Sequence, residues 1–259
     1  RPPYRGSLLA EGLEAWGVVR SVLSGEWLVP GYSADGKIVQ LYRYAKDWHT
    51  GKMLLQVTPE THHGLFGVPL YDPKKPDVLL CEGCWDGMAL WEVLHSVKRD
   101  GERLAVTANE GVSLLAAANV LATPGCNVFG KSWLRLLAKK RVFILYDNDH
   151  PREVNGKHVD GAGLSGVKRL ANLFSRAEQP PAEVHYLRWG THGYDPDLAS
   201  GYDVRDALSS AGGNLVARAE AWRRLFTRVV PAPAEWVTET GVVEIEMLPC
   251  RSWKVLVNS

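Results

Sequence analysis

The sequence lacks both a long hydrophobic run and an excess of charge of one sign. No stretch reaches the roughly 18 apolar residues that span a membrane, and the start, Arg1-Pro2-Pro3-Tyr4-Arg5, has no hydrophobic signal core. We therefore expect a cytoplasmic protein without membrane contact, and the absence of Met at position 1 suggests an excised fragment. Thirty basic and 29 acidic side chains give a net charge of +1, so any contact with nucleic acid must come from local patches.

Cysteine is also scarce, which excludes a disulfide framework in a chain of 259 residues. Cys81 and Cys84 form a Cys-x-x-Cys without a second pair, while Cys126 and Cys250 are isolated. Structural zinc generally needs four ligands. We therefore predict that Cys81 and Cys84 are small apolar residues at a junction between a strand and a helix.

Residues 1–76 predict a small mixed α+β subdomain. Residues 7–23 fit a helical stripe, and residues 26–32 and 37–44 have the composition of strands joined at Asp35-Gly36, a strong hairpin signal. Basic residues lie among aromatic ones here, a mixture that suits phosphate and base contacts but also a solvated hairpin face. These basic residues are Arg43, Lys46 and Lys52.

After Pro76 the pattern becomes that of an α/β fold with a parallel sheet flanked by helices, over residues 77–212. Strands such as 78–80 and 142–145 are apolar without alternation, which indicates helices on both faces. Residues 213–259 should add a helix and short strands, as a link to a further domain. The expected strands are 77–82, 103–108, 119–123, 141–147, 183–188, 242–247 and 253–257, and the expected helices are 86–99, 111–118, 131–140, 161–175, 203–211 and 214–228.

Acidic residues follow two of these apolar strands. Glu82 follows the first strand, and Asp147 and Asp149 follow the strand near residue 145. The residues between the two strands suffice for crossovers of a parallel sheet, so both acidic ends should lie at one edge. Carboxylates gathered there repel each other unless a cation neutralises them, and carboxylate oxygens suit Mg²⁺ or Mn²⁺. A solvated loop after a core strand is the alternative explanation for the two aspartates.

Three further acids are candidates for the same site. Asp86 can cap the helix that follows Glu82, and Asp203 can cap a helix in which Asp206 lies one turn on. Each of these roles is structural, so Asp86, Asp203 and Asp206 are weaker candidates than Glu82, Asp147 and Asp149.

Together the motifs resemble the TOPRIM family, and within it the primase type, over about residues 20–210. Their order and spacing carry the resemblance. The core motifs are Glu82-Gly83-x-x-Asp86, Ala122-Thr123-Pro124-Gly125, Asp147-x-Asp149 followed by Gly161-Ala162-Gly163, and Asp203-x-x-Asp206. Upstream motifs are Trp27-Leu28-Val29-Pro30, Asp35-Gly36-Lys37-Ile38-Val39, Thr58-Pro59-Glu60-Thr61, Leu65-Phe66-Gly67 and Leu70-Tyr71.

The resemblance implies that Glu82 acts as a general acid or base near a 3′-oxygen, and that Asp147 and Asp149, with Glu82, hold Mg²⁺ or Mn²⁺. It implies a primase-type nucleotidyltransferase of phage or mobile-element origin that makes primers on a single-stranded DNA template. Its substrates would be nucleoside triphosphates, and a helicase domain or subunit would be a further partner. A TOPRIM nuclease is a variant of this hypothesis.

The chain departs from the family pattern in several places. Ser24-Gly25-Glu26 stands where family primases carry two arginines around a glycine, and Gly67-Val68 stands where a lysine is usual. Residues 150–160 are inserted between Asp147-x-Asp149 and the glycine pair, with a hairpin turn predicted at Val154-Asn155-Gly156-Lys157. The zinc ribbon that usually precedes this core is not present in the sequence.

A competing motif is Gly125-Cys126-Asn127-Val128-Phe129-Gly130-Lys131-Ser132, which matches the Walker A pattern of P-loop ATPases. Its residues 126–129 are bulky for a loop that wraps phosphates, and it leaves Glu82 unexplained. Lys131, at the start of an expected helix, could bind phosphate under either hypothesis. A P-loop ATPase and a non-catalytic TOPRIM-like module that binds DNA or docks a helicase therefore stay open as alternatives.

Overall fold

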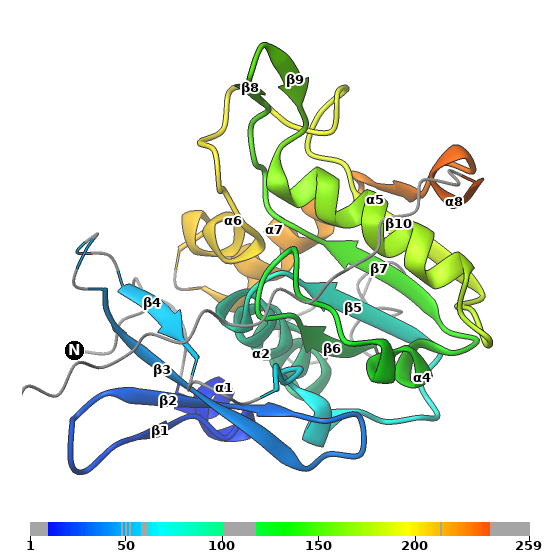
Figure 1. The fold of residues 1–259 in the computed structure, drawn as a ribbon. Coiled ribbons are helices and arrows are strands. Elements are labelled where there is room, and N and C mark those ends of the chain that lie inside the picture. Colours follow the sequence, from blue (N-terminus) through cyan, green and yellow to red (C-terminus); the bar gives the residue numbers. More distant parts are fainter. Residues whose placement is uncertain are drawn as a thin grey trace, which may run out of the picture.

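The computed structural model describes residues 10–47, 49, 51, 53–57, 62–100, 118–212 and 214–238. The strands form a four-stranded sheet, a five-stranded sheet and a separate two-stranded hairpin, which Figure 1 shows as three distinct parts of the molecule. No helix within these ranges is long and apolar enough to cross a bilayer. Several predicted features lie outside the described residues: Lys52, strand 103–108, nearly all of helix 111–118, and strands 242–247 and 253–257.

The four-stranded sheet is antiparallel and has the order β1-β2-β3-β4. The prediction of one helix over residues 7–23 is wrong beyond Ala15, because the chain turns at Gly17 with a φ of 71° and then enters β1. The predicted hairpin at Asp35-Gly36 is confirmed, since β2 and β3 pair across it. The elements are α1 (Ala10–Ala15), β1 (Val19–Arg20), β2 (Trp27–Tyr32), β3 (Ile38–Lys46) and β4 (Met53–Gln56).

The five-stranded sheet has the order β11-β10-β7-β5-β6, and all its neighbours are parallel except β10 and β11. The predicted α/β class with a parallel sheet is therefore confirmed. The antiparallel strand β11 was not predicted, because three residues beside two prolines carry too little pattern. The strands are β5 (Asp77–Cys81), β6 (Asn119–Ala122), β7 (Arg141–Leu145), β10 (Glu183–Leu187) and β11 (Val229–Pro231).

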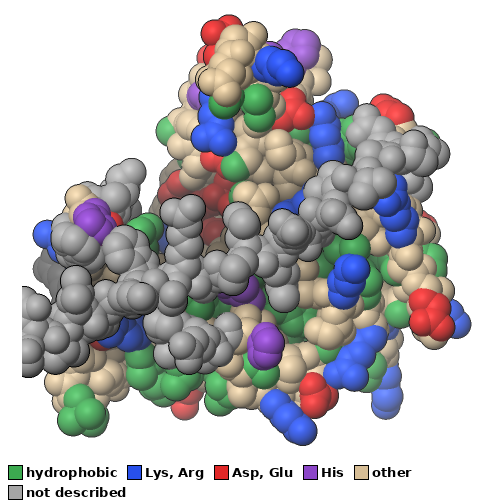
Figure 2. All heavy atoms as spheres, in the orientation of Figure 1, with side chains coloured by type: hydrophobic (Ala, Val, Ile, Leu, Met, Phe, Trp, Pro, Cys, Tyr) green, Lys and Arg blue, Asp and Glu red, His purple; other side chains and the backbone are tan. Residues whose placement is uncertain are grey.

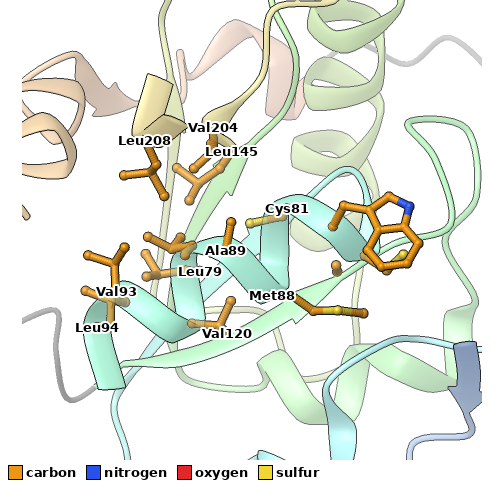
Figure 3. Close-up of a cluster of buried hydrophobic side chains, with 14 of the residues drawn as sticks. Leu79, Cys81, Met88, Ala89, Val93, Leu94, Val120, Leu145, Val204 and Leu208 are labelled. Atoms are coloured by element: carbon orange, nitrogen blue, oxygen red, sulfur yellow. The ribbon is translucent and has the colours of Figure 1, made fainter. Parts of the chain in front are cut away.

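Helices cover both faces of this sheet, which explains why its strands do not alternate between apolar and polar residues. Val78 and Leu80 belong to one buried cluster, whereas Leu79 and Cys81 belong to the other, so successive residues of β5 enter opposite cores. Figure 3 shows the second cluster, in which α2 lies against Leu79, Cys81 and Val120 of the strands. That core contains side chains of α2 (Cys84–Asp100), α6 (Val204–Ser210) and α7 (Leu215–Phe226), and the opposite core those of α4 (Leu134–Leu137) and α5 (Ala162–Ser175).

A two-residue segment joins the two larger sheets. Leu65 pairs with Tyr32 at the end of β2, and the next residue, Phe66, pairs with Ala122 at the end of β6. A Cβ added at the preceding Gly64 would lie 2.3 Å from the backbone of β2, so only glycine permits this approach. Leu65 and Phe66, part of an upstream motif of the resemblance, thus fix the four-stranded sheet against the parallel sheet.

The two-stranded hairpin is the insertion that the sequence predicted. Its strands β8 (Arg152–Val154) and β9 (Lys157–Val159) pair across Asn155 and Gly156, which have φ values of 52° and 73°. Two positive φ values suit a tight primed turn. The hairpin projects from the body of the molecule above α5 and β7 (Figure 1). The remaining short elements are η1 (Val68–Leu70), η3 (Lys131–Trp133) and α8 (Glu235–Thr238).

Candidate active site at the carboxyl edge of the parallel sheet

Glu82 and Asp147 meet where β5 and β7 end. The two strands are parallel neighbours with Cys81 opposite Leu145, so the residues that follow leave the sheet side by side. The backbone N–H of Asp147 donates to Glu82 Oε2 over 3.4 Å. Two apolar strands therefore deliver two carboxylates to one edge of the sheet, as the sequence predicted.

Asp149 is held beside this pair by the start of α5. Its Oδ2 accepts from the backbone N–H of Gly163 over 2.9 Å, and its own N–H donates to Asp147 O over 3.0 Å. A Cβ added at Gly163 would lie 2.3 Å from Asp147 O, and one at Gly161 would lie 1.9 Å from Asp149 O. The glycine pair therefore permits backbone packing that positions both aspartates.

Asn148, between the two aspartates, is fully buried and turned toward another segment. Its Nδ2 donates to Asp195 O over 3.0 Å and to Ala199 O over 3.2 Å, and its Oδ1 accepts from Asp195 N over 2.8 Å. The amide thus fastens the loop of residues 195–199 to the strand end.

Asp86 lies in the first turn of α2 rather than at its cap, so the predicted capping role is wrong. The residue is 6% exposed, and its Oδ1 has no hydrogen-bond partner although Arg205 Nε lies 4.0 Å away. The predicted cap at Asp203 is confirmed, since Oδ1 accepts from Asp206 N over 2.6 Å. Asp203 Oδ2 accepts from the Arg205 guanidinium over 2.8 Å. The start of α6 therefore brings an ion pair against Asp86, while Asp206 contributes its backbone N–H.

Burial and mutual repulsion disfavour the charged forms of these acids. Burial, and then the charge of Asp149, raises the pKa of Glu82. Burial and Asp203 raise the pKa of Asp86 well above its ordinary value, and burial and Glu82 do the same for Asp147. Arg205 lowers the pKa of Asp86 in turn, so it offsets part of the repulsion. Figure 2 shows acidic side chains in a recess below the projecting hairpin.

The donor set suits a hard divalent cation. Carboxylate oxygens are the ligands that Mg²⁺ and Mn²⁺ prefer, and the buried Oδ1 of Asp86 lacks a hydrogen-bond partner that a cation nearby would replace. Among the described residues, however, no three His, Cys, Asp or Glu side chains are already arranged around one point as metal ligands. The residues fit a cation in charge and chemistry, and the carboxylates would have to draw together to bind it.

The predicted basic contacts fall on different sides of β3. The Arg43 guanidinium lies 3.5 Å from Glu26 Oε2, whereas Lys46 is exposed and, three residues on, points to the opposite face. That face also carries Tyr44, whose ring lies 5.0 Å from the ring of Trp85 in the first turn of α2. Lys46 thus shares a strand face with a residue that packs beside the acidic edge, and Arg43 does not.

The loop with the Walker A pattern does not have the form of a phosphate loop. The Arg169 guanidinium donates to the carbonyls of Cys126 and Asn127, so these carbonyls are fastened to α5. The N–H of Val128 donates back to Gly125 O over 3.0 Å, and the α-helix that follows η3 has four residues. A phosphate site needs converging backbone N–H groups at the start of a longer helix. Lys131 is exposed at the start of η3.

Two residues of the site were not predicted. Arg205 could have been inferred from its place between two aspartates at a helix start. Cys126 gave no signal: its backbone N–H and thiol donate to Glu82, and burial raises the pKa of that thiol to about 12, so it stays protonated. The cysteine therefore orients the Glu82 carboxylate and does not act as a nucleophile.

A pocket of about 430 Å³ adjoins the acids. It lies between the β8–β9 hairpin, the start of α5 and the segment of residues 190–194. Its lining residues are Asp149, Pro151, His158, Asp160, Gly161, Leu164, His192 and Tyr194.

No family model and no curated protein matches this sequence. Solved structures do match. They are bacterial and phage primase catalytic cores. The zinc-binding and RNA polymerase domains of the Aquifex aeolicus primase are 20% identical, with 85% of this chain and 46% of that chain covered and a TM-score of 0.48.

Two further matches have similar values. A DnaG catalytic core is 16% identical, with 85% of this chain and 59% of that chain covered and a TM-score of 0.47. The primase fragment of the bacteriophage T7 primase-helicase is 14% identical, with 84% and 69% covered and a TM-score of 0.48. The present chain thus spans about half of the length of the first two structures that it matches.

Proposed function

We propose that this chain is the catalytic core of a primase, which joins nucleotides on a single-stranded DNA template in a reaction that depends on Mg²⁺ or Mn²⁺. The observation that carries the proposal is the convergence of Glu82, Asp86 and Asp147, all with raised pKa values, beside Asp149 at one sheet edge, where one buried carboxylate oxygen of Asp86 lacks a hydrogen-bond partner. Clustered acids of this kind are costly without a cation, and perturbed carboxyls in a recess are typical of functional sites.

The chemistry follows from the position of each acid. The 3′-hydroxyl of a growing primer attacks the α-phosphorus of a nucleoside triphosphate, a new P–O bond forms, and pyrophosphate leaves. The raised pKa of Glu82 suits it to accept the hydroxyl proton, because a base works best when its pKa approaches the working pH. Cys126 and the backbone of Asp147 hold that carboxylate in place.

Asp147 and Asp149 would hold the divalent cation, which supplies charge stabilisation to the phosphate oxygens. Asp86 and Asp203 face the same recess and repel the other acids, so they raise the gain from binding a cation. Arg205 contacts the carboxylates of both Asp86 and Asp203, and its positive charge stabilises the two acids in the site.

Among the basic residues predicted to contact nucleic acid, the exposed Lys46 is the best candidate for a contact with the template. Lys46 lies on the face of β3 that carries Tyr44, which packs on Trp85 next to the acidic edge. A lysine and aromatic rings together suit phosphate and base contacts of a single strand. Arg43 and Lys131 are weaker candidates, because Arg43 lies near Glu26 and Lys131 belongs to a loop folded onto Arg169.

The test is Mg²⁺-dependent primer synthesis on single-stranded templates, with the chain joined to its natural flanking segments. Asp147→Asn with Asp149→Asn, and separately Glu82→Gln, should each reduce the rate by on the order of 10²-fold or more. Lys131→Ala should stay within about twofold of the wild type, as should Asp197→Asn, an exposed aspartate that serves as the matched control.

Two results would contradict the proposal. ATP hydrolysis that is lost in Lys131→Ala and kept in the aspartate variants would favour a P-loop ATPase. If the protein binds DNA but makes no primers, and if none of the acidic substitutions changes DNA binding, the chain is a DNA-binding module and not a primase.

A further inference from the structure

The pocket beside Asp149 is built by segments that the catalytic acids do not need. One wall is the inserted β8–β9 hairpin with His158, and another is the segment 190–194 with His192 and Tyr194. Asp149 itself lines the pocket. The cavity therefore opens beside the proposed cation site and is made mostly by residues outside it.

Several contacts hold the segment 190–194 in one place. The Arg228 guanidinium donates to Trp189 O over 2.9 Å and to Asp195 Oδ2 over 3.2 Å, so both ends of the segment are fastened. A Cβ added at Gly190 would lie 2.2 Å from Tyr194 O, and the ring of Tyr194 lies 5.4 Å from that of His150. A ligand would meet a preformed wall, which lowers the entropy cost of binding.

The hairpin wall is fixed at its base. Lys168 Nζ of α5 lies 2.5 Å from Asp160 Oδ2, where β9 leads into the helix. His150, where the insertion starts, contacts the carbonyls of Asp195 and Leu198 at 3.2 and 2.9 Å. Both ends of the insertion are thus anchored, and its strands rise between the anchors to form the pocket.

The lining chemistry favours a nucleoside over a phosphate. Two imidazoles and a phenol offer hydrogen-bond donors, acceptors and flat rings, and Leu164 adds apolar surface. None of the described residues that line the pocket is a lysine or an arginine that would bind a phosphate, whereas the Asp160 carboxylate beside Lys168 can accept a hydrogen bond from a sugar hydroxyl. A volume of about 430 Å³ lies within the range of small-molecule sites.

We infer that this pocket takes the sugar and base of the nucleoside triphosphate whose phosphates lie at the acids, so that His158 and His192 set nucleotide affinity. The inference rests on the proposed primase function for the position of the phosphates. It assigns a role in substrate binding to the inserted hairpin, which lies on the opposite side of the molecule from the four-stranded sheet (Figure 1).

The first experiment measures primer synthesis against nucleotide concentration, with ATP, GTP, CTP and UTP and then the four deoxynucleotides. His158→Ala and His192→Ala should each raise KM about 3- to 10-fold, the effect of one lost hydrogen bond, and leave kcat within about twofold. His62→Ala is the matched control, because His62 is exposed and does not line the pocket. The double variant should raise KM further.

The second experiment does not depend on activity. Adenosine, guanosine, cytidine and uridine, which carry no phosphate, are titrated without metal into the wild type and the double variant, with NMR shifts of the histidine imidazoles as the readout. At least one nucleoside should shift His158 and His192 in the wild type, and should bind the double variant about 10-fold more weakly or more.

The outcomes of these experiments distinguish a failure of the pocket assignment from a failure of the proposed primase function. Unchanged KM in the double variant, with no nucleoside binding, overturns the pocket assignment even if primers are made. Nucleoside binding that the double variant loses, in a protein that makes no primers, supports the pocket and overturns the primase function. A variant that lowers kcat and leaves KM unchanged would show that the histidines act on structure or catalysis, which also overturns the assignment.

Discussion

Asp147→Asn should make the protein more stable at neutral pH when divalent cations are absent. The carboxyl has a pKa raised well above its ordinary value, first by burial and then by Glu82, so the folded state holds its proton more tightly than the unfolded state does. The stability that this proton contributes is present at low pH and is lost as the pH rises through the folded-state pKa. At neutral pH the carboxyl therefore destabilises the fold, because the unfolded state can ionise it freely and the folded state cannot, and asparagine removes this cost at nearly constant volume.

The repulsion by Glu82 adds to the effect of burial, and its size can be worked out. Two unit charges about 8 Å apart repel by roughly 2 kcal/mol at an effective dielectric of about 20. Asp147 is only partly shielded from solvent, so a gain of about 1–2 kcal/mol is the reasonable expectation, which raises Tm by roughly 2–8 °C. Mg²⁺ at about 100 times its Kd should stabilise the wild type by about 2.7 kcal/mol, or roughly 5–11 °C.

Thermal unfolding followed by circular dichroism, from pH 5 to 8 with EDTA or with Mg²⁺, measures both effects. In EDTA the difference in Tm between Asp147→Asn and the wild type should grow as the pH rises, and with Mg²⁺ the order of the two proteins should reverse. Asp197→Asn, at an exposed site, should follow the wild type throughout. The reasoning is refuted if Asp147→Asn is no more stable than the wild type in EDTA at pH 8, or if both gain equally from Mg²⁺.

Two further substitutions test the backbone around the acids. Gly163→Ala places a Cβ 2.3 Å from Asp147 O and should destabilise the fold by about 1–3 kcal/mol, which thermal unfolding shows as a lower Tm. Ser165→Ala in the same helix is the control and should change Tm little. An unchanged Tm for Gly163→Ala would show that α5 can shift to accommodate the added methyl group. Asn148→Ala removes the hydrogen bonds to Asp195 and should cost about 1–3 kcal/mol and speed hydrogen exchange across residues 195–199 in mass spectrometry; equal exchange would mean that another contact holds this loop.

The parallel sheet could be predicted because its strands are short apolar runs that end in distinctive residues. Val78 to Leu80 enter two different cores, and a residue buried on either face must be apolar, so the signal was strong. The same pattern placed Glu82 and Asp147 at one edge, because parallel strands share a direction. Long-range geometry of this kind follows from topology and needs no side-chain detail.

Features set by single contacts could not be predicted. The sequence pattern of residues 7–23 predicted one helix, yet the helix ends at Ala15, the chain turns at Gly17, and Val19 and Arg20 pair with β2 instead. Asp86 matched the composition of a helix cap, but the helix starts two residues earlier at Cys84, and the carboxylate is buried in the site. In both cases tertiary contacts decided between local structures of similar energy.

The pocket is a further limit of sequence reasoning. His158 lies in β9 and His192, 34 positions later, in the segment after β10, and neither belongs to a motif of its own. Only the fold shows that the hairpin and the segment after β10 stand on opposite sides of one cavity next to Asp149.

The short antiparallel strand β11 has a consequence for how this protein behaves at high concentration. In the part of the chain that the structure describes, it is the last strand on its side of the five-stranded sheet, where open backbone groups invite pairing with another molecule. It has three residues and ends at Pro231, which has no N–H to offer, and the chain then turns into α8, whose Trp236 ring packs against Tyr186. This edge is therefore a poor template for sheet growth, and the molecule is protected there against aggregation through added strands.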